Sequence, residues 1–189
     1  MRLHHLARVT LVVLDLEAAL AEHGFEQAQV SLFNVPEARA FSLGVPAIVG
    51  ARGAFIACVD STIGIELVEQ PNAQANTSLS AERFGWAGFE LKHNALSVTL
   101  NCLDSAVSAA FYLGLGANDV QQVDAQTRLI KLKHSALRFE SGKTDLPAMD
   151  LANLSVGILS VQFARIGSRG QIGPVRVLRG PDAELIEMV

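Results

Sequence analysis

The chain has 189 residues, of which 50% are apolar and 18% charged, with a formal net charge of −4. This apolar share excludes a disordered chain, and the negative charge argues against a nucleic-acid partner. Uninterrupted apolar runs fall short of the roughly 18 residues that a membrane span needs. Arg8 and Asp15 interrupt the first apolar run too early for a signal peptide. We therefore expect a cytoplasmic globular protein, with Cys58 and Cys102 as buried free thiols and no membrane partner.

A short internal repeat is the most informative feature of the sequence. Residues 9–15 read VTLVVLD and residues 98–104 read VTLNCLD, so five of seven positions are identical at an offset of 89 residues. In both copies an Ala- and Leu-rich stretch follows the Asp and ends at a Gly. Such a long period is not that of a solenoid or propeller and favours a duplicated supersecondary unit.

The first copy predicts a strand, a helix and three further strands. His5–Val13 alternates and is rich in β-branched residues, which is typical of a strand. Asp15 is placed to cap a helix that ends at Gly24. Pro and Gly residues then separate three candidate strands at 39–45, 53–59 and 63–69.

The second copy follows the same order, and a shorter third run comes after it. The second copy predicts a strand at 96–102, a helix at 104–114, and strands at 118–123, 127–133 and 136–141. The third run offers strands at 155–163, 174–179 and 184–189 without a helix. We therefore expect an α+β protein with a first β-α-β-β-β unit at 1–70, a linker at 71–95, a second unit at 96–141, and a linker plus truncated strand run at 142–189.

Three segments resemble the vicinal oxygen chelate superfamily, which includes glyoxalase I, extradiol dioxygenases and the bleomycin-resistance proteins. The run Leu11–Leu20 resembles the first strand and helix of a family unit, and Ile63–Glu69 its last strand. Arg179–Met188 resembles the family's closing turn and strand. The resemblance implies curved mixed sheets around a cleft, in which two His and two Glu hold a divalent metal that polarises the substrate.

The sequence departs from the family pattern at the implied metal ligands. The family's His stands seven residues before the Asp that starts the helix, and the same count gives Arg8, Ser97 and, in the third run, Val156. None of these suits the metals that imidazole binds. Glu66 and Glu187 match the family's acidic positions, whereas the second unit has Arg138 there. We therefore expect no metal cofactor; as the alternative, a divalent metal ion would be held by Glu66, Glu187 and His4.

Strand alternation groups the remaining polar candidates on one face. If Val9, Leu11 and Val13 pack under the helix, the opposite face carries polar side chains in both copies. In the family that the sequence resembles this face lines the cavity, so we expect a ligand pocket formed by Arg8, Thr10, Glu66, Ser97, Thr99, Asn101 and Glu187. Two alternatives stay open: the polar groups are only solvated, and the two Glu residues lie on solvent-facing strand surfaces. The adjacent His4 and His5 should point to opposite faces of a regular strand.

Two expectations concern how the units fit together. Trp86 should close the core between them. Three strand runs are an odd number for a family that closes its cavities with pairs. Either the third run completes the barrel of the second unit, or a second chain supplies the missing half, and a homodimer is the expected state.

Three functions follow from the sequence. The first is a glyoxalase-like protein that binds a small organic molecule in its cleft without the family's metal. The second is a divalent-metal-dependent lyase, isomerase or dioxygenase of the glyoxalase type. The third is a non-catalytic interaction protein whose cavity is filled by side chains. Since one fold hosts many chemistries, the fold does not choose between them.

Overall fold

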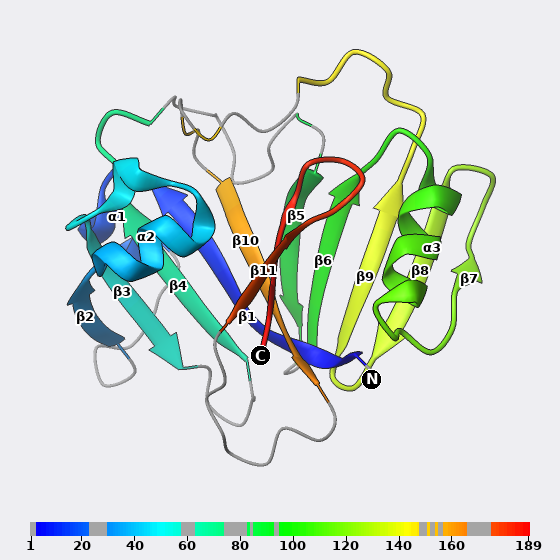
Figure 1. Cartoon of the computed structure of the whole chain (residues 1–189), viewed down its shortest axis with the longest axis horizontal. Helices are drawn as coiled ribbons and strands as arrows, with labels where there is room; N and C mark the ends of the chain where they lie inside the picture. Colours follow the sequence, from blue (N-terminus) through cyan, green and yellow to red (C-terminus); the bar gives the residue numbers. More distant parts are fainter. Residues whose placement is uncertain are drawn as a thin grey trace.

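Two β-sheets form the framework of the described part of the protein. The computed structural model describes residues 3–22, 30–57, 63–73, 83, 85–92, 95–147, 151, 154, 157–165 and 175–189. Within this part of the chain, a seven-stranded sheet lies beside a five-stranded sheet (Figure 1). Both sheets contain parallel and antiparallel pairs, so the predicted α+β class with mixed sheets is confirmed.

The elements follow one another as three runs. The first run is β1 (Leu3–Val13), α1 (Leu16–Glu22), β2 (Val30–Asn34), α2 (Glu37–Leu43), the 3-10 turn η2 (Pro46–Ile48), β3 (Arg52–Ala57) and β4 (Gly64–Glu69). The second is β5 (Gly85–Lys92), β6 (Ala95–Asn101), α3 (Ser105–Gly114), β7 (Gln121–Gln122), β8 (Thr127–Leu132) and β9 (Ser135–Glu140). The third is β10 (Gly157–Arg165), β11 (Arg176–Arg179) and β12 (Leu185–Met188).

Four strands follow the same order in both sheets: β1-β4-β3-β2 in the larger sheet corresponds to β6-β9-β8-β7 in the smaller one. The seven-stranded sheet has the order β11-β12-β10-β1-β4-β3-β2, and the five-stranded sheet has the order β5-β6-β9-β8-β7. In each sheet the strand before the helix pairs in parallel with the last strand of its run, as β1 with β4 and β6 with β9. The parallel pair requires a crossover connection, which α1 and α3 begin.

The third run extends the first unit rather than the second. β10 pairs antiparallel with β1, and β12 pairs in parallel with β10. The expectation that this run completes the second unit's barrel is therefore wrong. In the second unit, β5 already pairs with the edge of β6 where such a strand could add. In the first unit, β10 pairs with β1 and buries Val161 and Phe163 in the same core as Val9.

Three other local predictions are corrected. Residues 39–45, predicted as a strand, belong mostly to helix α2, which begins after Pro36 and ends at Gly44 in a left-handed conformation (φ 70°). The predicted linker at 71–95 contains strand β5. The strand predicted at 118–123 is only the two residues Gln121–Gln122.

One apolar cluster lies between the two sheets and a second lies on the far side of the seven-stranded sheet. The first joins Val9 and Leu11 of β1 to Val98 and Leu100 of β6, together with residues of α1 and α3. Asp15 and Asp104 cap these two helices through backbone N–H groups. The second cluster packs α2 and η2 against β1, β4 and β12. The insertion that holds α2 and η2 therefore covers the face of this sheet opposite the main core.

Three further expectations can be compared with the structure. Trp86 is fully buried in the main core and its Nε1 donates to the Leu185 carbonyl at 2.8 Å, so its predicted role is confirmed. Cys102 is a buried free thiol, as predicted, whereas Cys58 lies outside the described residues. Across the described segments, every helix is too short or too polar to span a bilayer.

Candidate functional site

Two carboxylates predicted to be important lie close together on the seven-stranded sheet. Thr10 of β1 stands opposite Glu66 of β4, and its hydroxyl donates to Glu66 Oε2 at 2.7 Å. Ser160 of β10 stands opposite Thr10, and its hydroxyl donates to Glu187 Oε1 at 2.6 Å. Four neighbouring strands, in the order β12-β10-β1-β4, therefore bring the two carboxylates to one patch of the sheet.

Arg39 of α2 bridges these carboxylates. Its Nη2 lies 2.9 Å from Glu66 Oε2 and 2.9 Å from Glu187 Oε1, and its Nη1 donates to Glu187 Oε2. The guanidinium fork thus binds both oxygens of Glu187 and one of Glu66, which is the geometry that favours Arg over Lys. We call Arg8, Arg39, Glu66 and Glu187, with Thr10 and Ser160, the arginine–glutamate centre.

Arg8 completes the charge balance of this centre. Its Nη2 donates to Glu187 Oε2 at 3.3 Å, and its Nε lies 3.3 Å from Glu66 Oε2. The Glu187 side chain is fully buried, whereas those of Arg8 and Arg39 are 20% and 15% exposed. Two positive and two negative groups leave no net charge in the centre.

The pKa values follow from this arrangement. Burial alone would raise the pKa of Glu187, but the hydrogen bond and charge of Arg39, with Arg8, outweigh burial and lower it. Burial likewise opposes the charge of Arg39, but Glu187 and Glu66 outweigh burial and raise the pKa of Arg39. All these contacts therefore favour the charged forms.

The structure separates the predicted ligand residues into two groups. Arg8, Thr10, Glu66 and Glu187 share the arginine–glutamate centre. Ser97, Thr99 and Asn101 lie on β6 in the other sheet. Arg39 was not among the predicted residues: its partners lie 27 and 148 residues away, so no local pattern reveals it.

The arginine–glutamate centre does not fit the divalent metal that the family resemblance implies. Glu66 Oε2 and both oxygens of Glu187 already accept hydrogen bonds from Arg39, Thr10 and Ser160. A divalent cation there would face two guanidinium groups at short range, which is strongly unfavourable in a buried setting. The chemistry of this donor set is that of an ion-pair network.

His4 does not join Glu66 and Glu187 as the alternative metal site required. It stands four residues before Arg8, which is about 13 Å along an extended strand. A register shift in β1 between Leu3 and His5 also corrects the expectation that His4 and His5 face opposite sides. Their Nδ1 atoms lie 2.8 Å apart in a hydrogen bond, and burial, followed by His4 and Lys133, lowers the pKa of His5.

The face of the five-stranded sheet that carries Ser97 is hollowed at one end. Ser97 pairs across the strands with Glu90 and Ala136, and Ala136 pairs with Lys131, so these four side chains share a face. A pocket of about 350 Å³ lies at this end of the sheet. Its lining residues come from β5, β6, β8, β9 and the turn between β8 and β9: Glu90, Ala95, Leu96, Ser97, Lys131, Leu132, His134, Ser135 and Ala136.

Thr99 and Asn101 are outside this pocket. Thr99 is half-buried and stands opposite Arg138, which pairs with Glu140 at 2.6 Å. Asn101 is buried, and its Nδ2 donates to the Arg83 carbonyl at 3.2 Å. Its hydrogen bond gives Asn101 a structural role in this part of the sheet.

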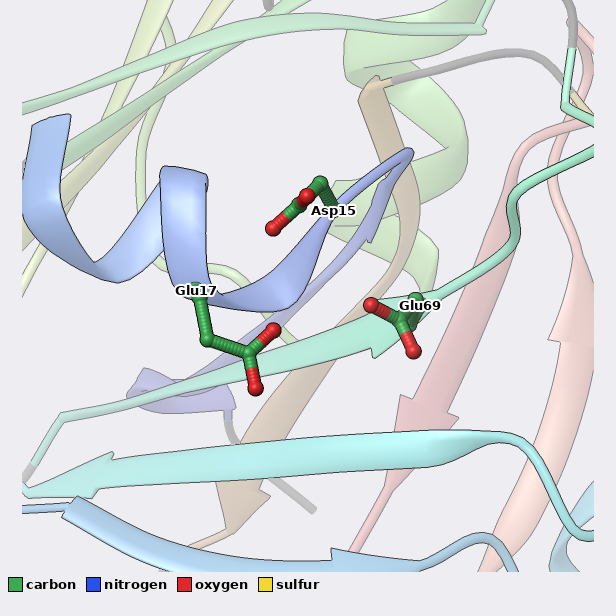
Figure 2. A group of neighbouring side chains, drawn as sticks. All are labelled: Asp15, Glu17 and Glu69. Atoms are coloured by element: carbon green, nitrogen blue, oxygen red, sulfur yellow. The ribbon is translucent and has the colours of Figure 1, made fainter.

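A group of acidic side chains surrounds the start of α1. Figure 2 shows Asp15, Glu17 and Glu69, whose carboxylates approach one another. Asp15 and Glu69 accept hydrogen bonds from backbone N–H groups of α1, and Arg52 pairs with Glu17 and Glu69. Helix capping and Arg52 account for these carboxylates without a metal ion.

A second buried polar cluster, absent from the sequence-based predictions, joins α3 to the turn before β12. The Tyr112 hydroxyl donates to Glu184 Oε1 at 2.9 Å, and the Asp182 N–H donates to Glu184 Oε2 at 2.9 Å. Ser108 donates to Asp182 at 2.6 Å. Burial raises the pKa of Glu184 to about 7 despite these hydrogen bonds. Burial, together with the charge of Asp182, raises the pKa of the Cys102 thiol to about 12.

We expect Gly180→Ala to destabilise the protein, because the Glu184 carboxylate fills the space beside Gly180. A Cβ atom there would clash with the carboxylate of Glu184. Displacing this buried carboxyl should lower the free energy of unfolding by about 1–3 kcal/mol, measured by urea denaturation. Gly114→Ala is the matched control: its Cβ would meet nothing within 4 Å at the end of α3. Equal stabilities for the two variants would contradict this packing.

Comparisons with known proteins add little to this geometry. No family model matches the sequence, and no curated protein matches it. Among solved structures, the chain is similar to the crystal structure of a "putative dioxygenase" from Bacillus subtilis, at 13% sequence identity and a TM-score of 0.36. The similarity covers 100% of this chain and 62% of that protein, so this chain spans less than two thirds of its length. The case for the fold rests on the strand orders of the two sheets.

Proposed function

We propose that the protein binds a small organic molecule in the pocket of its five-stranded sheet, on a glyoxalase-like fold and without a metal ion. The observation that carries the proposal is the pocket of about 350 Å³ beside Ser97, since small-ligand sites have volumes of about 300–1,000 Å³. The glyoxalase-like assignment is supported by the strand order common to both sheets, together with the sequence resemblance.

The lining of the pocket favours a ligand with an apolar body and a carboxylate. Ser97 and Ala136 are small side chains at adjacent positions of the sheet, and Leu132 adds an apolar surface. Lys131 stands next to Ala136 across the strands, and its ammonium group is a point charge that suits a carboxylate. We therefore propose small aliphatic or aromatic carboxylic acids as the ligand class.

Matched acids and amides test this proposal. Benzoate and hexanoate should raise the Tm of the purified protein, because a ligand that binds only the folded state stabilises it, whereas benzamide and hexanamide should not. Lys131→Met should weaken binding of the acid by about tenfold or more. Lys143→Met is the control, since Lys143 is exposed and outside the pocket.

Filling the pocket gives an independent readout. Ala136→Phe should abolish the Tm shift with every acid while leaving the unliganded fold intact, because residue 136 lines the pocket at the surface of the sheet. Acids that bind wild type and Ala136→Phe equally would place the ligand elsewhere. An absence of any acid-dependent shift at millimolar concentration would overturn the ligand class.

A filled cavity is the second candidate, favoured by the cover over the seven-stranded sheet. α2 and η2 pack Ala40, Leu43 and Ile48 against Val12 and Val68, and Arg39 covers the carboxylates. A non-catalytic interaction protein would show these features without binding acids. The homodimer also stays a prediction, and sedimentation of a strict monomer at micromolar concentration would contradict it.

A further inference from the structure

The two carboxylates of the arginine–glutamate centre occupy equivalent positions in the two halves of the seven-stranded sheet. Glu66 stands opposite Thr10 in the parallel pair β1–β4, and Glu187 stands opposite Gln162 in the parallel pair β10–β12. β1 and β10 run antiparallel, with Val9 opposite Val161. A local twofold axis through the Val9–Val161 pair therefore exchanges the two carboxylates.

The same axis identifies the residue equivalent to Arg8. The axis exchanges Val9 with Val161, and therefore also exchanges the residues that precede them by one position. Arg8 thus corresponds to Ser160. Counting along the chain instead gave Val156, which lies outside the described residues. The two equivalent positions thus hold a guanidinium on one side and a hydroxyl on the other, and the centre is asymmetric.

Arg39 contacts both carboxylates from helix α2, which is not part of either half of the sheet. Arg39 belongs to α2, which lies in the insertion between β2 and β3. Its Nη2 is 2.9 Å from an oxygen of each carboxylate. Ala40, the next residue, is fully buried in the second apolar cluster, which fixes the helix over the sheet.

We propose that Arg39 is a tethered cation that occupies a latent divalent-cation site between Glu66 and Glu187. Without Arg39 and Arg8, the centre would present two buried carboxylates and the hydroxyls of Thr10 and Ser160. Such an all-oxygen donor set suits hard divalent cations. The two guanidinium groups contact the same carboxylate oxygens, and that of Arg39 joins α2 to both halves of the sheet. This inference concerns a different sheet from the proposed ligand pocket and does not depend on it.

Removing the arginines in turn tests the proposal, with Mn²⁺ alone as the probe. Arg39→Met should lower Tm by about 10 °C, since breaking a buried ion pair leaves its partners uncompensated. In the double variant Arg8→Ser/Arg39→Met, 1 mM Mn²⁺ should raise Tm by about 5 °C or more, and excess chelator should reverse this rise. Wild type should respond to neither reagent.

Two further variants control the test. Arg179→Met removes an exposed arginine from β11 of the same sheet and should change neither Tm nor the response to Mn²⁺. Arg39→Lys keeps the charge but loses the fork, so it should lower Tm without creating a response to Mn²⁺.

Three outcomes would overturn the proposal. The first is an Arg39→Met protein as stable as wild type. The second is a folded double variant that does not bind Mn²⁺ by calorimetry. The third, decisive even if the other variants fail to fold, is an Arg39→Lys protein as stable as wild type.

Discussion

Glu187→Gln should lower the free energy of unfolding by about 3 kcal/mol near neutral pH. The side chain of Glu187 is fully buried and pairs with Arg39 and Arg8. Gln keeps the size of the side chain but loses the charge that compensates the two guanidinium groups. Urea denaturation of both proteins at pH 7 measures the effect, which corresponds to a Tm lower by about 10 °C for a chain of this length.

The pH dependence of this difference provides a second check. The pKa of Glu187 is lowered in the folded state, so its charge contributes stability above the unfolded-state pKa of about 4.5 and loses it as pH falls below that value. The difference between wild type and Glu187→Gln should therefore shrink below about pH 4.

The matched control is Glu17→Gln, which breaks an ion pair with Arg52 in which both side chains are more than half exposed. Solvent screens surface pairs of this kind, so the loss for Glu17→Gln should be small beside that for Glu187→Gln. Similar losses for Glu17→Gln and Glu187→Gln would contradict the assignment of the arginine–glutamate centre as a stabilising network.

Glu184→Gln should stabilise the protein at pH 8 by about 3 kcal/mol and have little effect at pH 5. Burial raises the pKa of Glu184 from 4.5 to about 7 in the folded state. The folded state therefore holds a proton that the unfolded state has released, and stability is lost as pH rises from about 4.5 to about 7. Gln removes this dependence and can still hydrogen-bond to Tyr112 and Asp182.

Urea denaturation at pH 5, 6, 7 and 8 tests the sign of this effect. Glu22→Gln is the control, because Glu22 is exposed at the end of α1 and its replacement should change the free energy of unfolding by no more than about 0.5 kcal/mol. If Glu184→Gln is less stable than wild type at pH 8, the buried carboxyl titrates well below neutrality and our account of this cluster is wrong.

Local patterns predicted those parts of the fold whose determinants are close in sequence. Asp15 caps α1, and the strands carrying the two VTL motifs lie at equivalent places in the two sheets. Helix α2 had a local pattern too, with Pro36 before it and Gly44 after it, but these residues served only to delimit a predicted strand at 39–45. Burial of Ala40 and Leu43 against the sheet settles the helix, and this contact is not local.

The candidate site could be predicted only in part for the same reason. Glu66 and Glu187 were predicted because they match the acidic positions of the family that the sequence resembles. The pairing of β10 with β1, which brings them together, depends on residues some 150 positions apart. Arg39 and Glu184 lacked any sequence pattern, because their roles arise from partners supplied by distant strands and helices.

Elemental analysis of the native protein, combined with a chelator titration, tests the central claim most directly. The claim is that guanidinium groups, rather than a metal ion, compensate Glu66 and Glu187. We predict no stoichiometric Mn, Fe, Ni or Zn and a Tm that excess EDTA leaves unchanged, since removing a ligand specific to the folded state must lower Tm. About one divalent metal ion per chain, lost together with several degrees of Tm on chelation and absent from Glu187→Gln, would contradict the account.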